Sequence, residues 1–406
     1  MIAAARAVEP ADAIVGVSPA RVVEPATVAE AAEALRELAT GKLAVAFAGG
    51  GTELELGAPP RRLDALLRTR RLARVREHAP ADQIVAVEAG MTVAALQRTL
   101  APHGQRLALD PPDAERATVG GVLAANAFGP RRTRYGSVRD LVIGVTLVRA
   151  DGVVAHGGGK VVKNVAGFDL PRLLCGSLGT LGLVAEVVFR LHPLPEASAT
   201  AVFEGLAGVD VRDVLPALRE LAVEPTALAA LPDARKFRLA VRFEGFAPGV
   251  KDQVERVLGR AGGGARLEDA EEAVLWARHD ALRAAGSTRV KATFAPAALV
   301  PALDALSPLQ AALGPEGPVV HPALGIAFLA GEAADAAAVA AGIEHARSRL
   351  KPLGNGAVVV AAAPPAVRAL VDPWGPAPAG IEVMRRLKAE LDPEGRLAPG
   401  RFVGGI

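Results

Sequence analysis

The first strong pattern in the chain is a helical repeat of apolar residues that begins after Thr27. Apolar side chains three and four residues apart share one face of a helix. Thr27 and Glu30 have the spacing of a capping box, which satisfies the first free amides of a helix, and Gly41 ends the pattern. The apolar positions of this predicted helix are Val28, Ala31, Leu35 and Leu38.

Two short apolar runs, 43–48 and 84–89, predict buried strands, and the first of them leads directly into three glycines. After the second run, Thr92 is the predicted N-cap of a helix that continues to Leu100. The opening part of the chain therefore contains two predicted units of helix and strand.

A hairpin is predicted at Asp151-Gly152, which lies between the apolar segments 141–150 and 153–155. This dipeptide is typical of a tight turn in which both central residues have positive φ. Further along, residues 183–191 alternate between apolar and polar with the period of a half-buried strand, and two prolines follow within 193–195. We place the main domain boundary after these prolines.

The second half of the chain is rich in alanine and mixes helical with extended patterns. This order predicts a sheet covered by helices on one face. The expected helices are 211–221, 250–260 and 331–350, and the expected strands are 236–243, 289–294, 325–329 and 357–360.

Composition narrows the class of protein. Hydrophobic residues make up 51% of the 406 residues, yet no uncharged apolar run approaches the roughly 18 residues that a membrane span needs. The start of the chain lacks the apolar core of a secretory signal, so we expect a cytoplasmic protein. A net charge of +2 and only 3% aromatic residues argue against nucleic-acid binding. The single Cys175 excludes an intrachain disulfide or cysteine-ligated metal cluster.

Three consecutive glycines, Gly49, Gly50 and Gly51, follow the first predicted strand. The segment lacks the lysine of a nucleotide triphosphatase loop, and Leu54 stands where a dinucleotide-binding fingerprint has its third glycine. Two interpretations remain. Successive backbone amides could surround a diphosphate that glycine allows to approach closely, or the segment could be a flexible turn.

Four further segments rich in small residues follow this one, and the five in order resemble the FAD-binding domain of the vanillyl-alcohol oxidase/p-cresol methylhydroxylase family. Within that family, GGGKVVKNVAGFDLPRLLCGSLGTLG is similar to the FAD-binding subunits of bacterial glycolate oxidases. The resemblance covers about 20–195 and includes 387–401, whereas 200–375 agree only in general character. The four further segments are 110–127, 134–140, 157–170 and 176–182.

The resemblance implies an α+β fold. Residues 1–196 would form a two-subdomain FAD-binding domain of the vanillyl-alcohol oxidase type. Residues 197–380 would form a second α+β domain with a helix-covered sheet, serving as a cap, substrate or interface domain, and 381–406 would return to the first domain as a helix and tail.

The resemblance also assigns the cofactor-binding residues. The loop around the three glycines would hold the FAD diphosphate, the next two segments would line the flavin and its ribityl chain, and the last would supply backbone contacts. The residues implied are Ala48, Gly49, Gly50, Gly51, Thr52, Glu53, Pro111, Thr118, Gly120, Gly121, Asn126, Arg134, Tyr135, Gly136, Lys163, Gly182 and Val184.

Three positions bear on how the cofactor is held. Lys160 and Lys163 are the only lysines between 42 and 236, which favours a site that uses a compact ammonium over a solvated surface pair. Relatives that attach FAD covalently commonly use a histidine where this chain has Thr52. We therefore predict noncovalent FAD.

The resemblance implies a flavoprotein oxidoreductase. Catalytic relatives carry an acid where Leu178 stands and a histidine-rich segment in the second domain; this chain has neither, and His321 is the one histidine we would test as a base. We therefore expect an accessory FAD-binding, electron-transferring subunit of a glycolate oxidase complex, which converts glycolate to glyoxylate. Its partners would be a catalytic FAD subunit and an iron–sulfur subunit, through which it would be peripheral to the membrane. A free-standing FAD-dependent 2-hydroxy-acid dehydrogenase of the D-lactate type and a flavin-free assembly scaffold are the alternatives.

Overall fold

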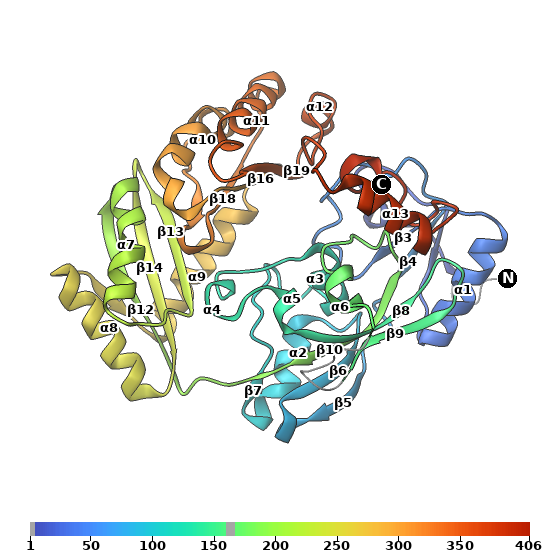
Figure 1. The fold of residues 1–406 in the computed structure, drawn as a ribbon, viewed down its shortest axis with the longest axis horizontal. Coiled ribbons are helices and arrows are strands. Elements are labelled where there is room, and N and C mark those ends of the chain that lie inside the picture. Colours follow the sequence, from blue (N-terminus) through green and yellow to red (C-terminus); the bar gives the residue numbers. More distant parts are fainter. Residues whose placement is uncertain (1–4, 160–166) are drawn as a thin grey trace. The chain divides into compact units, whose positions relative to one another are not determined.

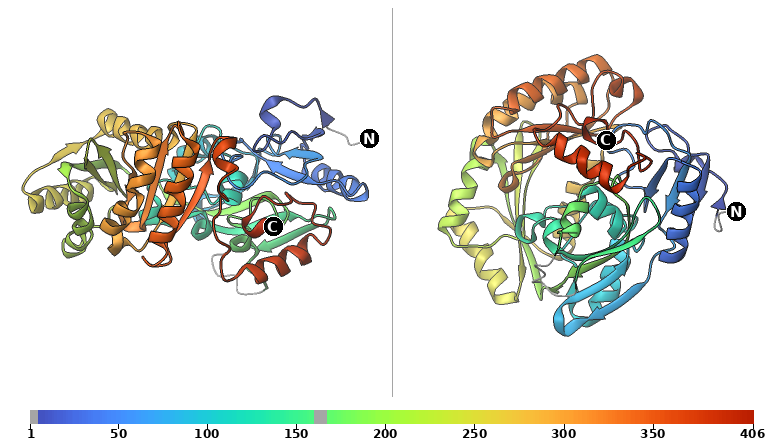
Figure 2. Two further views of the ribbon diagram at one scale, coloured as in Figure 1. Left: turned by 90° about the horizontal axis from the view of Figure 1, so that it is seen from above. Right: turned by 45° about the vertical axis from the view of Figure 1, so that its right-hand side comes forward.

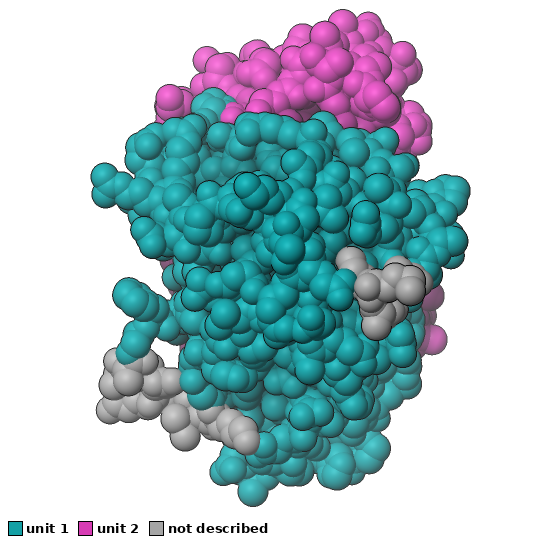
Figure 3. All heavy atoms as spheres, turned by 90° about the vertical axis from the view of Figure 1, so that its right-hand side faces the viewer, with its two compact units in different colours: residues 1–129, 135–194, 376–406 teal, residues 130–134, 195–375 magenta. Residues whose placement is uncertain are grey.

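The computed structural model describes residues 5–159 and 167–406. It divides into two compact units, which Figure 3 distinguishes by colour. Unit 1 comprises residues 1–129, 135–194 and 376–406, and unit 2 comprises 130–134 and 195–375. The sequence placed the boundaries at 196 and 380 and did not anticipate that 130–134 group with unit 2. Among the described residues no helix is long and apolar enough to span a bilayer.

The first sheet of unit 1 has the order β1-β2-β4-β3, with β2, β4 and β3 parallel. Helix α1 (Val28–Thr40) connects β2 to β3 as the apolar pattern predicts, and Thr27 caps it by accepting a hydrogen bond from the amide of Glu30. The Glu30 carboxylate accepts from the amide of Ala26. The strands are β1 (Ala5–Arg6), β2 (Arg21–Val23), β3 (Val45–Ala48) and β4 (Ala65–Arg68).

The second sheet of unit 1 is antiparallel, with the order β5-β6-β10-β8-β9 (Figure 1). One face, which carries Phe189 of β10, packs against short helices that contain Leu96 and Leu123, and the other reaches α1 through Leu183 and Ala185. The strands are β5 (Val75–Ala79), β6 (Ile84–Glu88), β8 (Val142–Val148), β9 (Val154–Gly158) and β10 (Leu183–Arg190), and β7 (Gln105–Arg106) pairs with β11 (His192–Pro193). The helices of unit 1 here are α2 (Val93–Leu100), α3 (Val119–Ala125), α5 (Val138–Leu141) and α6 (Leu170–Leu174), whereas α4 (Arg132–Tyr135) falls mostly in the segment that groups with unit 2.

Strands β8 and β9 form the predicted hairpin, but its turn differs from the expected one. Gly152 has φ of +77°, whereas Asp151 is not among the described residues with positive φ. The amide of Gly152 donates to the carbonyl of Arg149, and the amide of Arg149 donates to that of Val153. The connection is therefore a longer loop with a single left-handed glycine, and the prediction of two positive φ values was wrong.

Unit 2 is built on one antiparallel sheet with the order β15-β12-β14-β13-β17-β18-β16-β19. Figure 2 shows the ribbon from two further sides. The strands are β12 (Ala197–Leu206), β13 (Ala227–Asp233), β14 (Lys236–Gly245), β15 (Ala265–Leu267), β16 (Thr288–Thr293), β17 (Val319–His321), β18 (Ile326–Gly331) and β19 (Ala357–Ala362). The helices are α7 (Gly208–Glu220), α8 (Ala247–Ala261), α9 (Asp269–Ala284), α10 (Leu299–Leu313), α11 (Ala336–Leu350) and α12 (Pro365–Arg368).

Helices cover both faces of this sheet. Leu228 and Ala230 of β13 pack into the large core that α7, α8, α10 and α11 complete, whereas Ala229 and Leu231 pack on the other side with Trp276 of α9. Alternate residues of a strand face opposite sides, so α9 lies on the second face. The expectation of helices on one face alone was therefore wrong.

Candidate functional site

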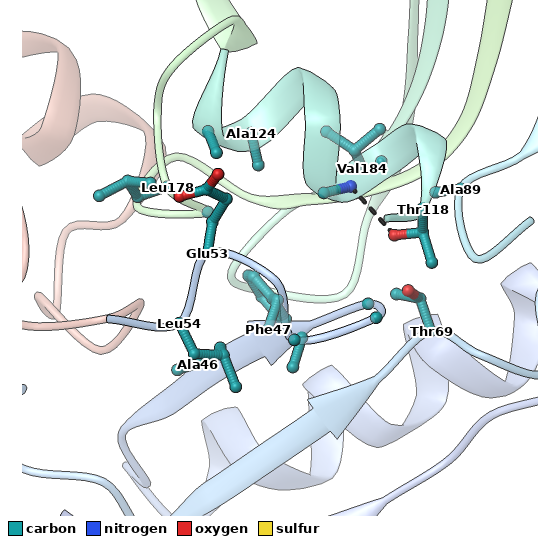
Figure 4. A pocket seen from close by; sticks show the side chains of 18 of the residues that line it. Ala46, Phe47, Glu53, Leu54, Thr69, Ala89, Thr118, Ala124, Leu178 and Val184 are labelled. Atoms are coloured by element: carbon teal, nitrogen blue, oxygen red, sulfur yellow. Dashed lines mark hydrogen bonds between the residues drawn. The ribbon is translucent and has the colours of Figure 1, made fainter. Parts of the chain in front are cut away.

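A cleft with about 800 Å³ of empty space, part of it open to solvent, lies within unit 1 (Figure 4). Its walls come from the end of β3 and the loop after it, from the start of α3, and from the loop that precedes β10. Most lining residues are apolar or are glycines, which suits a ligand with large flat surfaces. Eleven of the predicted cofactor-binding residues line it: Ala48, Gly49, Gly50, Gly51, Thr52, Glu53, Thr118, Gly120, Gly121, Gly182 and Val184.

The three consecutive glycines are required by local packing. A Cβ on Gly49 would stand 2.0 Å from Oγ1 of Thr118, and one on Gly50 would stand 1.6 Å from the carbonyl oxygen of Arg116. Gly51 has φ of +80°, a backbone conformation that residues other than glycine adopt only at a cost in free energy. The loop thus lies directly against residues 116–118.

The backbone amides of this loop are available to a ligand. The amides of Gly49, Gly50, Gly51 and Thr52 donate no hydrogen bond to another described residue. Amides without a partner in the fold can donate to a ligand, and successive amides form a concave anion site. We infer that the loop is suited to hold a diphosphate, in agreement with the anion-binding interpretation of the sequence.

The amides at the start of α3, unlike those of the 49–52 loop, already donate hydrogen bonds within the fold. Those of Gly120 and Gly121 donate to the carbonyl of Ala89 and to the hydroxyl of Thr118. Gly120 is required because a Cβ there would stand 2.6 Å from the Cβ of Ala89. These two glycines therefore shape the wall of the cleft, whereas the donors come from the 49–52 loop.

The third wall is the loop that leads into β10. Leu178 has φ of +51°, and its amide donates to the carbonyl of Ala124, which ties the loop to α3. A Cβ on Gly179 would stand 2.8 Å from Phe47, and one on Gly182 would stand 2.5 Å from Leu147. A branched residue held in the left-handed region marks a position that the surrounding structure determines.

Two side chains with charge line the cleft, Glu53 and Arg401. Sequence reasoning missed Arg401, although the resemblance of 387–401 to the family's tail was a signal that could have found it. One of its guanidinium nitrogens, Nη2, donates to the carbonyls of Leu54 and Leu56 at 3.1 and 2.7 Å. Arg401 therefore holds the segment after the glycines and adds positive charge beside a site suited to an anion.

Five predicted residues lie outside the lining. Pro111 is buried, and Asn126 ends α3 with φ of +51°. Arg134 groups with unit 2, where it pairs with Glu224 at 2.7 Å. Tyr135 accepts a hydrogen bond from Arg106, and Gly136, with φ of +77°, packs against Asp140. Their contact with a cofactor stays a prediction; Lys160 and Lys163 lie outside the described residues.

His321 does not lie at the surface of the protein. It is fully buried in unit 2, where its Nε2 lies 2.8 Å from Nε2 of His279, and it does not line the cleft of unit 1. Burial holds its pKa well below the usual value, and the nearby His279, Arg283 and Arg132 act in the same direction. Within the described residues no group of three or more metal-binding side chains is placed to hold a metal.

Thr118 joins the glycine loop to the helix and offers a simple test of that joint. Its hydroxyl caps α3 by accepting from the amide of Gly121 at 3.2 Å. We expect Thr118→Ala to lower the free energy of unfolding by about 1 kcal/mol, the usual effect of losing an N-cap, and Thr118→Ser to restore it. Urea denaturation measures both; an unchanged midpoint for Thr118→Ala would show that the cap contributes nothing.

Comparison with known proteins identifies the domain that contains this cleft. Residues 19–158 match the family model of an FAD binding domain. The match includes the glycine loop and α3, and it ends within the hairpin β8–β9. The cofactor implied by the five sequence segments is thus confirmed as FAD.

Curated relatives match part of the chain. The chain is 30% identical over 255 residues to glycolate oxidase subunit GlcD of Bacillus subtilis, covering 59% of this chain and 54% of that protein. It is 34% identical over 153 residues to glycolate oxidase subunit GlcE of Escherichia coli, covering 37% and 43%. Over 174 residues it is 38% identical to D-lactate dehydrogenase of Archaeoglobus fulgidus, covering 42% and 38%. The chain thus spans about half the length, or less, of these relatives.

The fold as a whole has a known counterpart. The match to a solved structure of alkyldihydroxyacetonephosphate synthase covers 94% of this chain and 76% of that chain, with a TM-score of 0.69 and 17% identity. At this identity the match concerns the fold alone, and it includes both units. The chain therefore contains an FAD-binding domain in a two-unit α+β fold, and it resembles the FAD-linked oxidoreductases that share that domain.

Proposed function

We propose that this chain is the FAD-binding subunit of a glycolate oxidase complex and supports the oxidation of glycolate to glyoxylate. The observation that carries the proposal is the composition of the cleft. The amides at one wall donate no hydrogen bond to another described residue, the other surfaces are apolar, and the charged side chains are Glu53 and Arg401. No histidine lines it among the described residues. A cleft built this way suits a flavin, and the glycolate oxidase subunits among the relatives favour the role of a subunit.

The residues of the cleft suggest how it would hold FAD. The amides of 49–52 would bind the diphosphate, and Arg401 would offset part of its charge. Thr52 carries no group that attaches a flavin in the manner of histidine, so we propose that the cofactor is noncovalent. Bound FAD supplies the redox chemistry, accepting and passing on electrons.

The partners in this proposal are a catalytic FAD subunit and an iron–sulfur subunit. Two of the relatives are named as glycolate oxidase subunits GlcD and GlcE, which supports membership of such a complex. Cys175 is the one cysteine of the chain, so an iron–sulfur cluster ligated by cysteine would have to reside elsewhere. We also propose a cytoplasmic location, with any attachment to a membrane provided by the partner subunits.

A free-standing FAD-dependent 2-hydroxy-acid dehydrogenase is the second candidate. The 38% identity to a D-lactate dehydrogenase favours it. The two candidates differ in whether the isolated chain reacts with a substrate.

Anaerobic reduction of the purified, FAD-loaded chain separates the candidates. We expect the flavin absorbance near its visible maximum to persist when glycolate or D-lactate is added, and to bleach only when the partner subunits are present. Bleaching by either acid in the isolated chain would establish the second candidate instead. A chain that stays colourless after incubation with FAD would overturn both and leave an assembly scaffold.

The same preparation tests the mode of attachment. Acid precipitation should release the yellow colour into the supernatant, because no covalent bond holds the flavin. Colour retained in the pellet would contradict noncovalent binding.

A further inference from the structure

Residues 376–406 return to unit 1 after the chain has completed unit 2, and helix α13 (Ile381–Leu391) begins this returning segment. Its extended part lies beside β3, where the amide of Val45 donates to the carbonyl of Arg396 and the amide of Ala398 donates to the carbonyl of Val45. Because β3 leads into the glycine loop, the returning segment is continuous with one wall of the cleft.

Lys388 on α13 makes three hydrogen bonds from a single ammonium group. Its Nζ donates to the carbonyl of Thr180 at 2.8 Å, to Oδ2 of Asp392 at 2.7 Å and to the carbonyl of Leu397 at 2.7 Å. Thr180 lies between Leu178 and Gly182, which both line the cleft. One side chain therefore ties the loop before β10 to the returning segment.

The environment of this ammonium makes it hard to replace. The Lys388 side chain is 12% exposed and that of Asp392 is fully buried. Burial lowers the pKa of Lys388, while its hydrogen bond and attraction to Asp392 act in the opposite direction. An ammonium presents three donors, and here all three have an acceptor. Without it, two carbonyls and a buried carboxylate would lose a charged donor.

Arg401, thirteen residues further along, acts on the opposite wall. Its guanidinium donates to the carbonyls of Leu54 and Leu56, and its own carbonyl accepts from the amide of Ala58. The returning segment thus holds the 49–56 loop through Arg401 and the 178–182 loop through Lys388. These loops form two walls of one cleft.

We propose that Lys388 is a positioning residue for the flavin: by fixing the carbonyl of Thr180, it sets the 178–182 loop against the cofactor, while Arg401 sets the facing loop. The proposal rests on FAD binding in this cleft. It assigns to the returning segment a role in how tightly and in what environment FAD is held, in addition to its contribution to folding.

The test compares Lys388→Met with Asp392→Asn in the full chain. Lys388→Met removes the bond to Thr180; Asp392→Asn keeps that bond but weakens the same buried cluster. We expect Lys388→Met to raise the Kd for FAD about tenfold, the factor for about 1.4 kcal/mol, and to change the visible circular dichroism of the bound flavin. Asp392→Asn should lower the unfolding midpoint and leave the flavin spectrum unchanged. Lys251→Met, on an exposed face of α8, is the control.

The outcomes decide between a positioning and a purely structural role. Equal flavin spectra and Kd values for Lys388→Met and wild type, measured where both are folded, would overturn the proposal, as would the same spectral change in Asp392→Asn. If Lys388→Met does not fold, Lys388→Arg serves instead: its guanidinium keeps the charge but cannot place donors on all three acceptors, so the spectral change should persist. Failure of the wild type to bind FAD would instead contradict the proposed function.

Discussion

Replacing Gly50 with valine is expected to abolish FAD binding. The new Cβ would lie 1.6 Å from the carbonyl oxygen of Arg116, which is a backbone atom and cannot rotate away. The 49–52 loop must then move as a whole, and the amides that would hold the diphosphate move with it. We expect Gly50→Ala to lose most of the bound FAD as well, because the clash arises at Cβ.

Flavin absorbance after purification and reconstitution measures this effect, together with the unfolding midpoint. Gly259→Ala is the matched control: Gly259 lies within α8 of unit 2, with open space around its Cβ position, so alanine there should preserve FAD binding and slightly stabilise the helix. A Gly50→Val protein that retains stoichiometric FAD would show that the loop does not bind the cofactor.

Gly50 also shows how far sequence reasoning reaches. The run of three glycines predicted a close approach to the backbone, and the ligand was taken as the cause. The structure adds a second cause, because Arg116 stands at the same point from 66 residues away. Spacing along the chain contains no information about such a non-local contact, so the position of the site could be predicted but the reason for its glycines only in part.

The elements that were predicted well have local signals. Helix α1 begins after Thr27 and α2 after Thr92, and each threonine accepts a hydrogen bond from an amide three residues later. Helix α9 lacks a side-chain cap and carries charged residues in its first turn, and it was missed. Its position on the second face of the sheet depends on Leu275 and Trp276, which find their partners only in the folded unit.

The segment 130–134 illustrates a different limit. Arg134 was predicted to continue the wall of the flavin site, and that contact stays a prediction. The structure shows that Arg131 bonds Glu244 and Arg134 bonds Glu224, both in unit 2. Ion pairs join residues about a hundred positions apart in sequence here, and a single sequence with many arginines and acids does not indicate which of them meet.

Acid is expected to destabilise unit 2 through its buried histidine pair. The carboxylate of Asp280 lies 2.9 Å from Nδ1 of His279, which therefore donates to it; Nε2 of His279 then accepts from Nε2 of His321 at 2.8 Å. In this arrangement both rings can be neutral. With His321 protonated on Nε2, a second proton on His279 would place two donors face to face, and both rings have no exposure to water.

The charges around the pair determine the direction of the effect. Burial lowers the pKa of both histidines; Arg283 lowers it further for each, Arg242 for His279 and Arg132 for His321, while Asp280 raises that of His279. The unfolded chain, where histidine titrates near 6.5, therefore binds protons that the folded unit does not. The contribution of the histidine pair to the free energy of unfolding is therefore fully present above pH 6.5. It decreases as the pH falls below 6.5, by up to about 1.4 kcal/mol per pH unit for each histidine.

Urea unfolding of the chain at several values between pH 8 and pH 5 measures this dependence. We expect the paired variant His279→Gln, His321→Gln to flatten the curve below pH 6.5, even though it is less stable at pH 8, because glutamine takes up no proton. His345→Asn, an exposed position on α11, should leave the slope of wild type unchanged. The slope isolates the histidines from general acid effects, since the carboxylates are the same in all three proteins. A wild-type curve that stays level down to pH 5 would mean that the folded unit accepts the protons, and hence that the pair is charged within it.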